Sequence, residues 1–160
     1  MQVVSSRAQP PVRACASLSR WRRAIMRGNR AHARGEHAVA KACYGVALRV
    51  ASELYGHIAD AEAGTAALVV AYHNLADTHA SLGAVEDRAV CLCEAHQLLC
   101  RATTGENGEL GDAWRQAALR HSRQTYAELL RFLSEQPDHA RAKAVAALDP
   151  TRGASAGRPH

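Results

Sequence analysis

The stretch of residues 28–48, "GNRAHARGEHAVAKACYGVAL", places a glycine, Gly35, between two segments with helical spacing. Glycine ends a helix readily because it takes the left-handed backbone conformation without strain. In the second segment Ala40 and Ala47 lie seven residues apart, with Tyr44 between them. Small side chains at regular places let the axes of neighbouring helices come close together. The stretch therefore predicts two helices that fold back on each other and pack closely.

The same pattern returns 48 residues further along the chain, where residues 76–95 align with residues 28–47. A single helix pair cannot bury its apolar face, so repeated pairs stack on each other. In the second copy Arg88 stands where a small residue is expected, and Ala89 comes one place later. This departure predicts either a one-residue slip in the turn after Gly83 or looser packing there.

Helical periodicity extends over most of the chain. No segment alternates polar and apolar residues with a period of two, so the sequence predicts an all-α fold without a sheet. Thr65 is predicted to cap the third helix. About five helices are expected, at residues 18–34, 37–57, 66–82, 85–101 and 112–135.

The expected organisation is one helical domain with a segment on each side. Residues 1–17 are predicted to form a disordered basic arm, and residues 136–160 a mostly disordered tail. The helical domain between them is predicted to span residues 18–135, with repeats at about 21–57 and 66–102 and a capping helix at 112–135.

Two segments of the chain resemble the tetratricopeptide repeat, in the long-helix form of the kinesin light chains. Residues 26–48, "MRGNRAHARGEHAVAKACYGVAL", carry the small residue, the turn glycine and the aromatic at the family's places. Residues 72–83, "YHNLADTHASLG", are similar to the first helix of another repeat. The resemblance covers about residues 21–102, and the chain is also similar to small uncharacterised bacterial proteins of this type.

The resemblance has two departures from the family's pattern. The spacing of 48 residues exceeds the family's period of about 34 residues, so the second helix or its connector is expected to be lengthened. Two repeats and a capping helix are few for a stable stack. This implies that a second copy of the chain, as a homodimer, or another partner covers exposed apolar surface.

In the tetratricopeptide family the first helix of each repeat lines a concave groove that binds a peptide. Asparagine offers both a donor and an acceptor, so Asn29 and Asn74 are predicted to hold a peptide backbone. The alternative is that Asn29 is a helix cap or a surface residue and that Asn74 packs between helices. The full set of groove positions that the resemblance implies is Arg22, Ile25, Asn29 and His32 in the first unit and His73, Asn74, Asp77 and Ala80 in the second.

Positive charge is concentrated at the N-terminal end of the chain. The formal net charge is +5, yet residues 1–35 hold eight arginines and no acidic residue. Residues 36–160 carry the other 12 of the 20 basic residues against all 15 acidic ones, a net charge of −3. An arginine arm can bind RNA through phosphate contacts, so an RNA-associated protein is an alternative function. No aromatic platform accompanies the arginines, and nucleic acid is therefore not the expected partner.

Cys91, Cys93, His96 and Cys100 form a cluster of residue types that ligate metals. Spacings of three and four put Cys93, His96 and Cys100 on one helical face, while Cys91 points away and leaves a tetrahedral site one ligand short. The competing explanation is that these cysteines are small apolar residues of the core. No metal site is predicted, and a thiol-based metal sensor stays as a further alternative function.

The sequence contains no glycine-rich phosphate loop, no His-Glu-x-x-His pair and no nucleophile elbow. Cys93 and His96 lie within one helical turn, which is poor geometry for a nucleophile and its base, and His73 with Asp77 fits a groove contact better. We therefore expect a non-enzymatic interaction module, a scaffold, chaperone or regulatory adaptor, that binds a protein or peptide without a cofactor. No stretch approaches the roughly 20 apolar residues that span a bilayer, so a cytoplasmic location without membrane association is predicted.

Overall fold

The computed structural model describes residues 11–105 and 110–148 of the chain. These residues fold into helices joined by short turns, and no strand occurs among them, which confirms the all-α prediction. In place of about five helices, the described residues form six: α1 (Pro11–Ala33), α2 (His37–Leu54), α3 (Ala61–Ser81), α4 (Val85–Thr104), α5 (Asp112–Glu135) and α6 (Ala140–Ala147).

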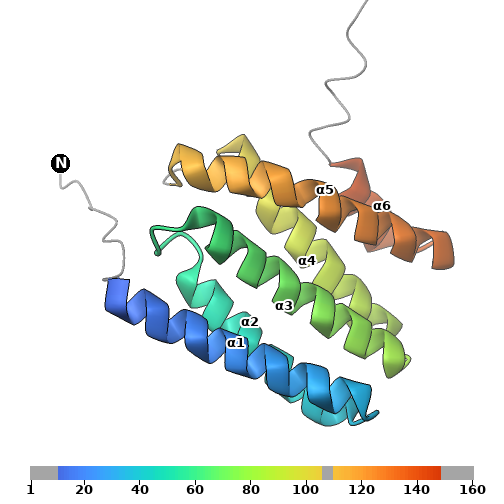
Figure 1. Cartoon of the computed structure of the whole chain (residues 1–160). Helices are drawn as coiled ribbons and strands as arrows, with labels where there is room; N and C mark the ends of the chain where they lie inside the picture. Colours follow the sequence, from blue (N-terminus) through green and yellow to red (C-terminus); the bar gives the residue numbers. More distant parts are fainter. Residues whose placement is uncertain (1–10, 106–109, 149–160) are drawn as a thin grey trace, which may run out of the picture.

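The helices are arranged in two layers (Figure 1). α1, α3 and α5 lie side by side in one layer, and α2, α4 and α6 lie behind them. α1 pairs with α2 and α3 pairs with α4, and the second pair packs against the first chiefly through α2 and α3. The expected stacking of helix pairs, as in a helical repeat, is therefore present.

A single hydrophobic cluster draws buried residues from all six helices. Half or more of its members are alanines, so the helices approach closely and the core is thin. A specific bond also joins the two hairpins, because the indole N–H of Trp21 in α1 donates to the backbone oxygen of Ala67 in α3 at 3.1 Å. The two hairpins are thus packed on each other and not splayed apart.

The turns after α1 and α3 have the same geometry. Gly35 and Gly83 both adopt positive φ angles, 76° and 69°. In each turn the glycine N–H donates to the carbonyl three residues back, and the next N–H donates to the carbonyl five residues back, at 2.9 to 3.0 Å. Because these bonds recur 48 residues apart, the turn after Gly83 has no slip, and that prediction is wrong.

Arg88 stands at the position equivalent to Ala40, but its long side chain reaches a third helix, α5. Its guanidinium donates to both carboxylate oxygens of Glu135 in α5, at 2.5 and 3.1 Å, and lies 5.3 Å from the centre of the Phe132 ring. The side chain is only 12% exposed, and the neighbouring Ala89 is fully buried. Looser packing is therefore also wrong, since the long side chain spans the distance to α5.

Gly28 is required by the ring of Tyr44. A Cβ atom at position 28 would lie 2.4 Å from Cε1 of Tyr44, much closer than carbon atoms can approach. In the second hairpin the equivalent positions hold Ala76 and Leu92, both buried in the same cluster. The larger side chain, Tyr44, thus stands opposite glycine, and the smaller one, Leu92, stands opposite alanine.

The start of α1 differs from the prediction. α1 begins at Pro11 and not at Leu18, so residues 11–17 belong to a helix and not to the arm. Proline suits the first turn of a helix because its missing N–H would have no partner there, and Ala14 and Leu18 pack against a buried cluster. The remaining part of the predicted arm, residues 1–10, lies outside the described residues.

α6 was not expected within the predicted tail. Its residues Ala142, Val145 and Ala146 are buried at helical spacing in the main cluster, which supplies the energy that orders so short a helix. The ring of His139 caps it by accepting a hydrogen bond from the N–H of Ala142 at 3.2 Å. Residues 149–160 of the predicted tail lie outside the described residues.

α3 begins five residues earlier than the predicted start at residue 66. Asp60 is its N-cap, because its carboxylate accepts a hydrogen bond from the N–H of Ala63 at 2.9 Å. Thr65, the predicted cap, is fully buried inside the helix. Aspartate and threonine are both common N-cap residues, so the sequence alone does not show whether Asp60 or Thr65 begins α3.

Replacing Gly28 with alanine should lower the free energy of unfolding by about 1–3 kcal/mol, because the new methyl group overlaps the Tyr44 ring. Urea denaturation measures the change. Gly45→Ala is the matched control, since no atom lies within 4 Å of the position of its Cβ. We expect Gly45→Ala to leave the free energy of unfolding unchanged or to raise it by up to about 1 kcal/mol.

The double variant Gly28→Ala with Tyr44→Leu copies the residue pair of the second hairpin. It should be more stable than the sum of the two single changes predicts, because leucine relieves the overlap. Strictly additive effects in urea denaturation would contradict the size match between the two positions.

Candidate functional site between α1 and α3

A cavity of about 260 Å³ opens between α1 and α3, and we refer to it as the α1–α3 cavity. Most of its wall comes from the leading helices of the two hairpins, as the groove prediction requires. Its lining residues are Asn29, His32 and Ala33 of α1, Tyr44 of α2, and Asn74 and Asp77 of α3.

Tyr44 fixes the orientation of Asn29. The phenol of Tyr44 donates a hydrogen bond to Oδ1 of Asn29 at 2.7 Å. Burial, followed by the negative charge of Asp77, raises the pKa of Tyr44, so the phenol keeps its proton and stays a donor. The bond occupies the amide oxygen of Asn29 and leaves its NH₂ group as the donor for a ligand.

His32 is oriented by a hydroxyl group of α3. Its Nδ1 lies 3.4 Å from Oγ1 of Thr78, and this hydroxyl donates its own proton to the carbonyl of Asn74 at 2.8 Å. The hydroxyl oxygen can therefore only accept from His32, which places the ring proton on Nδ1 and leaves Nε2 as an acceptor. The ring of His37 packs against His32 in a T-shaped contact, with centres 5.0 Å apart.

Charged groups extend the polar surface from α3 to α5. The carboxylate of Asp77 lies 3.8 Å from Arg131, which also pairs with Glu128 on its own helix. His73 is close to these groups, and its Nε2 atom is buried without a hydrogen-bond partner in the described part of the chain. Burial lowers the pKa of His73, although the charges of Glu128 and Asp77 oppose this effect.

The structure brings together four of the six predicted site residues. Asn29, His32, Asn74 and Asp77 all line the α1–α3 cavity. His73 is beside them but does not line the cavity, and it makes no hydrogen bond to Asp77. What these residues bind stays a prediction.

Two other groove positions lie elsewhere, and one lies at the surface. Arg22 is two helical turns away and lines a separate cavity of about 350 Å³ with Leu18 and Ile58. Ile25 is 9% exposed and belongs to the core, so its assignment to the groove is wrong. Ala80 is exposed but does not line the α1–α3 cavity.

Sequence reasoning missed the contributions of Tyr44 and Arg131. Tyr44 was expected as a packing residue, and only its position opposite Asn29 across the same turn hints at the hydrogen bond. Arg131 lies in α5, where the repeat pattern is too faint to align, so no sequence signal places it beside Asp77.

The described side chains of the cysteine cluster are not grouped as metal ligands would be. Cys93 is fully buried and Cys91 nearly so, and burial raises the pKa of both thiols, that of Cys91 to about 11. Metal ligation needs deprotonated thiols, which such sites disfavour. Within residues 11–105 and 110–148, no group of three or more His, Cys, Asp or Glu side chains is placed to hold a metal ion.

Residues 19–154 match the model of a family described as "Protein of unknown function (DUF2753)". The chain belongs to this family. The DUF2753 match begins within α1 and includes both hairpins and the α1–α3 cavity. No curated protein and no solved structure matches the chain.

The resemblance to tetratricopeptide repeats stays a prediction, because the matching model is that of DUF2753. As for membranes, none of the helices that the structure describes combines the length and the apolar character needed to cross one.

The lowered pKa of His73 predicts a stability that depends on pH. The unfolded chain protonates this residue near pH 6.5, but the folded protein resists protonation until a lower pH. Acidification from pH 7.5 to 5.5 should therefore lower the free energy of unfolding, because the unfolded state binds more protons in this range. His79 should add to this loss of stability at low pH, since burial also lowers the pKa of His79.

His73→Gln should reduce this pH dependence of the free energy of unfolding, as measured by urea denaturation at several pH values. His57→Gln, at an exposed histidine between α2 and α3, is the control and should keep it. An unchanged pH dependence in His73→Gln would contradict the role of buried His73.

Proposed function

We propose that this protein is a non-enzymatic interaction module that binds an extended protein or peptide segment in the α1–α3 cavity. The observation that best supports this is the meeting of Asn29, His32, Asn74 and Asp77 on the leading helices of two stacked hairpins. The pair Asn29 and His32 is far from the pair Asn74 and Asp77 in the sequence, and the fold brings the two pairs to one place.

The chemistry of the cavity suits a peptide backbone. An extended peptide alternates N–H donors and C=O acceptors. The NH₂ group of Asn29 offers a donor, Nε2 of His32 and the carboxylate of Asp77 offer acceptors, and the amide of Asn74 offers both. Such a set of groups binds the backbone of a peptide whatever its sequence. Selectivity for one partner then depends on contacts with that partner's side chains.

The residues that line the α1–α3 cavity also favour binding without catalysis. None of the six lining residues is a serine, threonine, cysteine or lysine, and the three that could also act as nucleophiles, His32, Tyr44 and Asp77, already contact Thr78, Asn29 and Arg131. The phenol of Tyr44 is held protonated and is already bonded to Asn29. Because the cavity is small, we expect an affinity on the order of micromolar.

A random peptide display library tests the proposal. Peptides enriched on the wild-type protein should bind the double variant Asn74→Ala with Asp77→Ala at least about tenfold more weakly, as judged by isothermal titration calorimetry. Gln116→Ala with Glu53→Ala removes an exposed amide and an exposed carboxylate outside the cavity, and this control should bind as the wild type does. Enriched peptides that bind both double variants equally would refute the assignment of the cavity.

Arginines on the outside of α1 support a second candidate function, the binding of RNA. Of these arginines only Arg13 falls within the predicted disordered arm, residues 1–17, and the structure places it on α1 as well. α1 contains no acidic residue, and none of these arginines takes part in an ion pair among the described residues. We call this set the α1 arginine stripe, and its exposed members are Arg13, Arg20, Arg23, Arg27, Arg30 and Arg34.

The geometry of the α1 arginine stripe favours a duplex over a single strand. Spacings of three, four and seven residues keep the six side chains on one side of the helix, along roughly 30 Å at about 1.5 Å per residue. The nearby Trp21 is half-buried and bonded to Ala67, so it offers no platform for stacking bases. Double-stranded RNA, which proteins contact through its phosphates and its shape, fits such a row of cations.

Neutralising three arginines of the stripe, with Arg20→Gln, Arg27→Gln and Arg34→Gln, should weaken binding to a double-stranded RNA and reduce the slope of log K against log salt by about 2–3. Fluorescence anisotropy at several salt concentrations measures both effects. The control variant Arg49→Gln, Arg101→Gln and Arg123→Gln removes the same charge from exposed positions on α2, α4 and α5. Equal losses in the two triple variants would show that only net charge matters and would refute the role of the stripe.

A further inference from the structure

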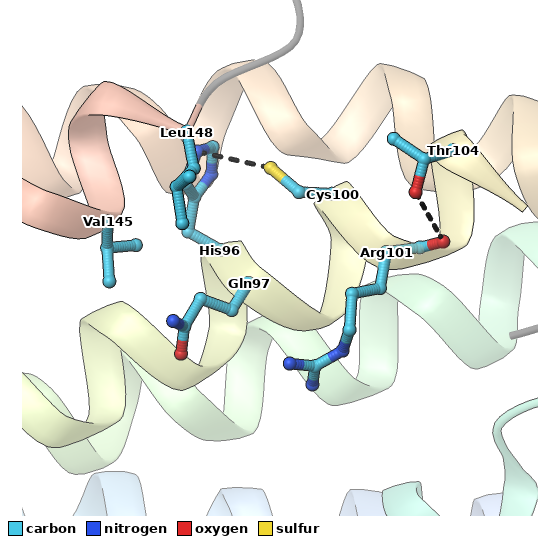
Figure 2. Close-up of a pocket in the computed structure, with 7 residues that line it drawn as sticks. All are labelled: His96, Gln97, Cys100, Arg101, Thr104, Val145 and Leu148. Carbon is cyan, nitrogen blue, oxygen red and sulfur yellow. Dashed lines mark hydrogen bonds between the residues drawn. The ribbon is translucent and has the colours of Figure 1, made fainter. Parts of the chain in front are cut away.

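A second cavity, of about 240 Å³, lies between α4 and α6, and we refer to it as the α4–α6 cavity. Its walls belong to α4 and α6, and α6 lies behind α5 at the end of the stack opposite α1 (Figure 1). One face of α4 supplies a thiol, an imidazole, an amide and a guanidinium, and α6 and the residue after it add apolar surface (Figure 2). The lining residues are His96, Gln97, Cys100, Arg101, Thr104, Val145 and Leu148.

The thiol of Cys100 points toward the ring of His96 (Figure 2). Its Sγ lies 3.4 Å from Nε2 of His96, one helical turn earlier in α4. On the other side of the ring, Nδ1 lies 2.9 Å from Oγ1 of Thr125 in α5. Thr125 donates its own hydroxyl proton to the carbonyl of Ser122 at 3.0 Å.

This chain of contacts fixes the tautomer of His96. Because the proton of Thr125 is already given to Ser122, its oxygen accepts a hydrogen bond from Nδ1 of His96. A neutral ring with its proton on Nδ1 has its lone pair on Nε2, and this lone pair faces the Cys100 thiol. His96 is fully buried and its ring packs on Tyr126, with centres 5.4 Å apart, so the arrangement is held rigidly.

A thiol next to such an acceptor can become a thiolate. When the proton passes from Sγ to Nε2, the imidazolium keeps both of its hydrogen bonds, to the hydroxyl oxygen of Thr125 and to the new thiolate. Cys100 is partly exposed, whereas Cys91 and Cys93 are buried. Activated cysteines have these properties: a proton acceptor in contact and an open side toward solvent.

We propose that Cys100 is a thiol-modification site that forms a mixed disulfide with a small disulfide carrying carboxylate groups. Arg101 and Gln97 also line the cavity, and their side chains extend on one side of α4 (Figure 2), where the guanidinium and the amide can bind a carboxylate. This inference concerns a different cavity from that of the proposed function and does not depend on it.

The exchange step balances without a further reactant. The Cys100 proton moves to Nε2 of His96, and the thiolate attacks one sulfur of the small disulfide. The S–S bond of that disulfide breaks as the new bond to Sγ of Cys100 forms. The leaving thiolate then takes the proton from His96, so one sulfur of the small molecule is reduced while Cys100 is oxidised.

Cys15 gives an internal reference for the test, because it is exposed on α1 and outside the α4–α6 cavity. The reduced full-length protein is incubated with glutathione disulfide at pH 7, and the modified Cys15 and Cys100 peptides are quantified over time by mass spectrometry. We expect Cys100 to react about tenfold faster than Cys15, although it is less exposed, because more of it is thiolate. Reaction in the order of exposure, with Cys15 the faster, would overturn the proposal.

Thr125→Val tests whether the orientation of His96 matters. Valine keeps the volume of threonine but cannot accept the hydrogen bond from Nδ1, so the rate at Cys100 should fall while the rate at Cys15 stays the same. Thr125→Ser retains the hydroxyl and should keep the rate at Cys100. An unchanged Cys100 rate in Thr125→Val would mean that the His96 contact is only structural, which overturns the activation of the thiol.

Arg101→Gln tests the class of disulfide. It should slow the reaction of Cys100 with glutathione disulfide, which carries carboxylates, and not the reaction with bis(2-hydroxyethyl) disulfide, which carries none. Arg123→Gln, on the exposed side of α5, is the control and should change neither rate. If Arg101→Gln leaves both rates unchanged, the preference for carboxylates is wrong.

Discussion

The close contact of α1 with α2 at Gly28 is the constraint on which the site depends. Without a Cβ atom at position 28, the ring of Tyr44 lies directly against the backbone of α1. That position brings the phenol within hydrogen-bond distance of Asn29 and makes the same ring part of the cavity wall. One packing contact thus sets the spacing of the first hairpin and orients the polar side chain of Asn29 in the cavity wall. The stability of the hairpin and the geometry of the cavity are linked there through a single side chain.

The sequence predicted the hairpins and their register because both follow from local rules. Gly35 and Gly83 mark the turns, and the 48-residue repeat predicts which residues of the two helices in each hairpin face each other. The ends of the helices were harder, because tertiary packing decides them. Nothing in the alanine-rich residues 140–147 distinguishes a helix from a tail until Val145 is seen buried against the core. Likewise, the early start of α1 follows from the packing of Ala14 and Leu18.

The repeat predicted which residues of α1 and α3 lie close together, but it carried no information about α5. Asn74 and Asp77 were placed near Asn29 because they sit on equivalent helices, and the structure brings them to one cavity. Arg131 comes from α5, which has no recognisable place in the repeat. The sequence therefore could not predict that Arg131 lies beside Asp77. The pair of His96 and Cys100 is visible as a spacing of four residues. Its chemical meaning comes from Thr125, 29 residues after His96 in the sequence, which determines the nitrogen that carries the proton.

The α1 arginine stripe has a consequence for self-association. A stack of helix pairs has an open end, and the outer side of its first helix is where another pair would dock. In this protein that end is lined with cations and has no carboxylate of its own. Two molecules that met end to end through α1 would bring like charges into a poorly hydrated contact, which electrostatic repulsion opposes. The arginines therefore disfavour the end-to-end addition of a second molecule through α1.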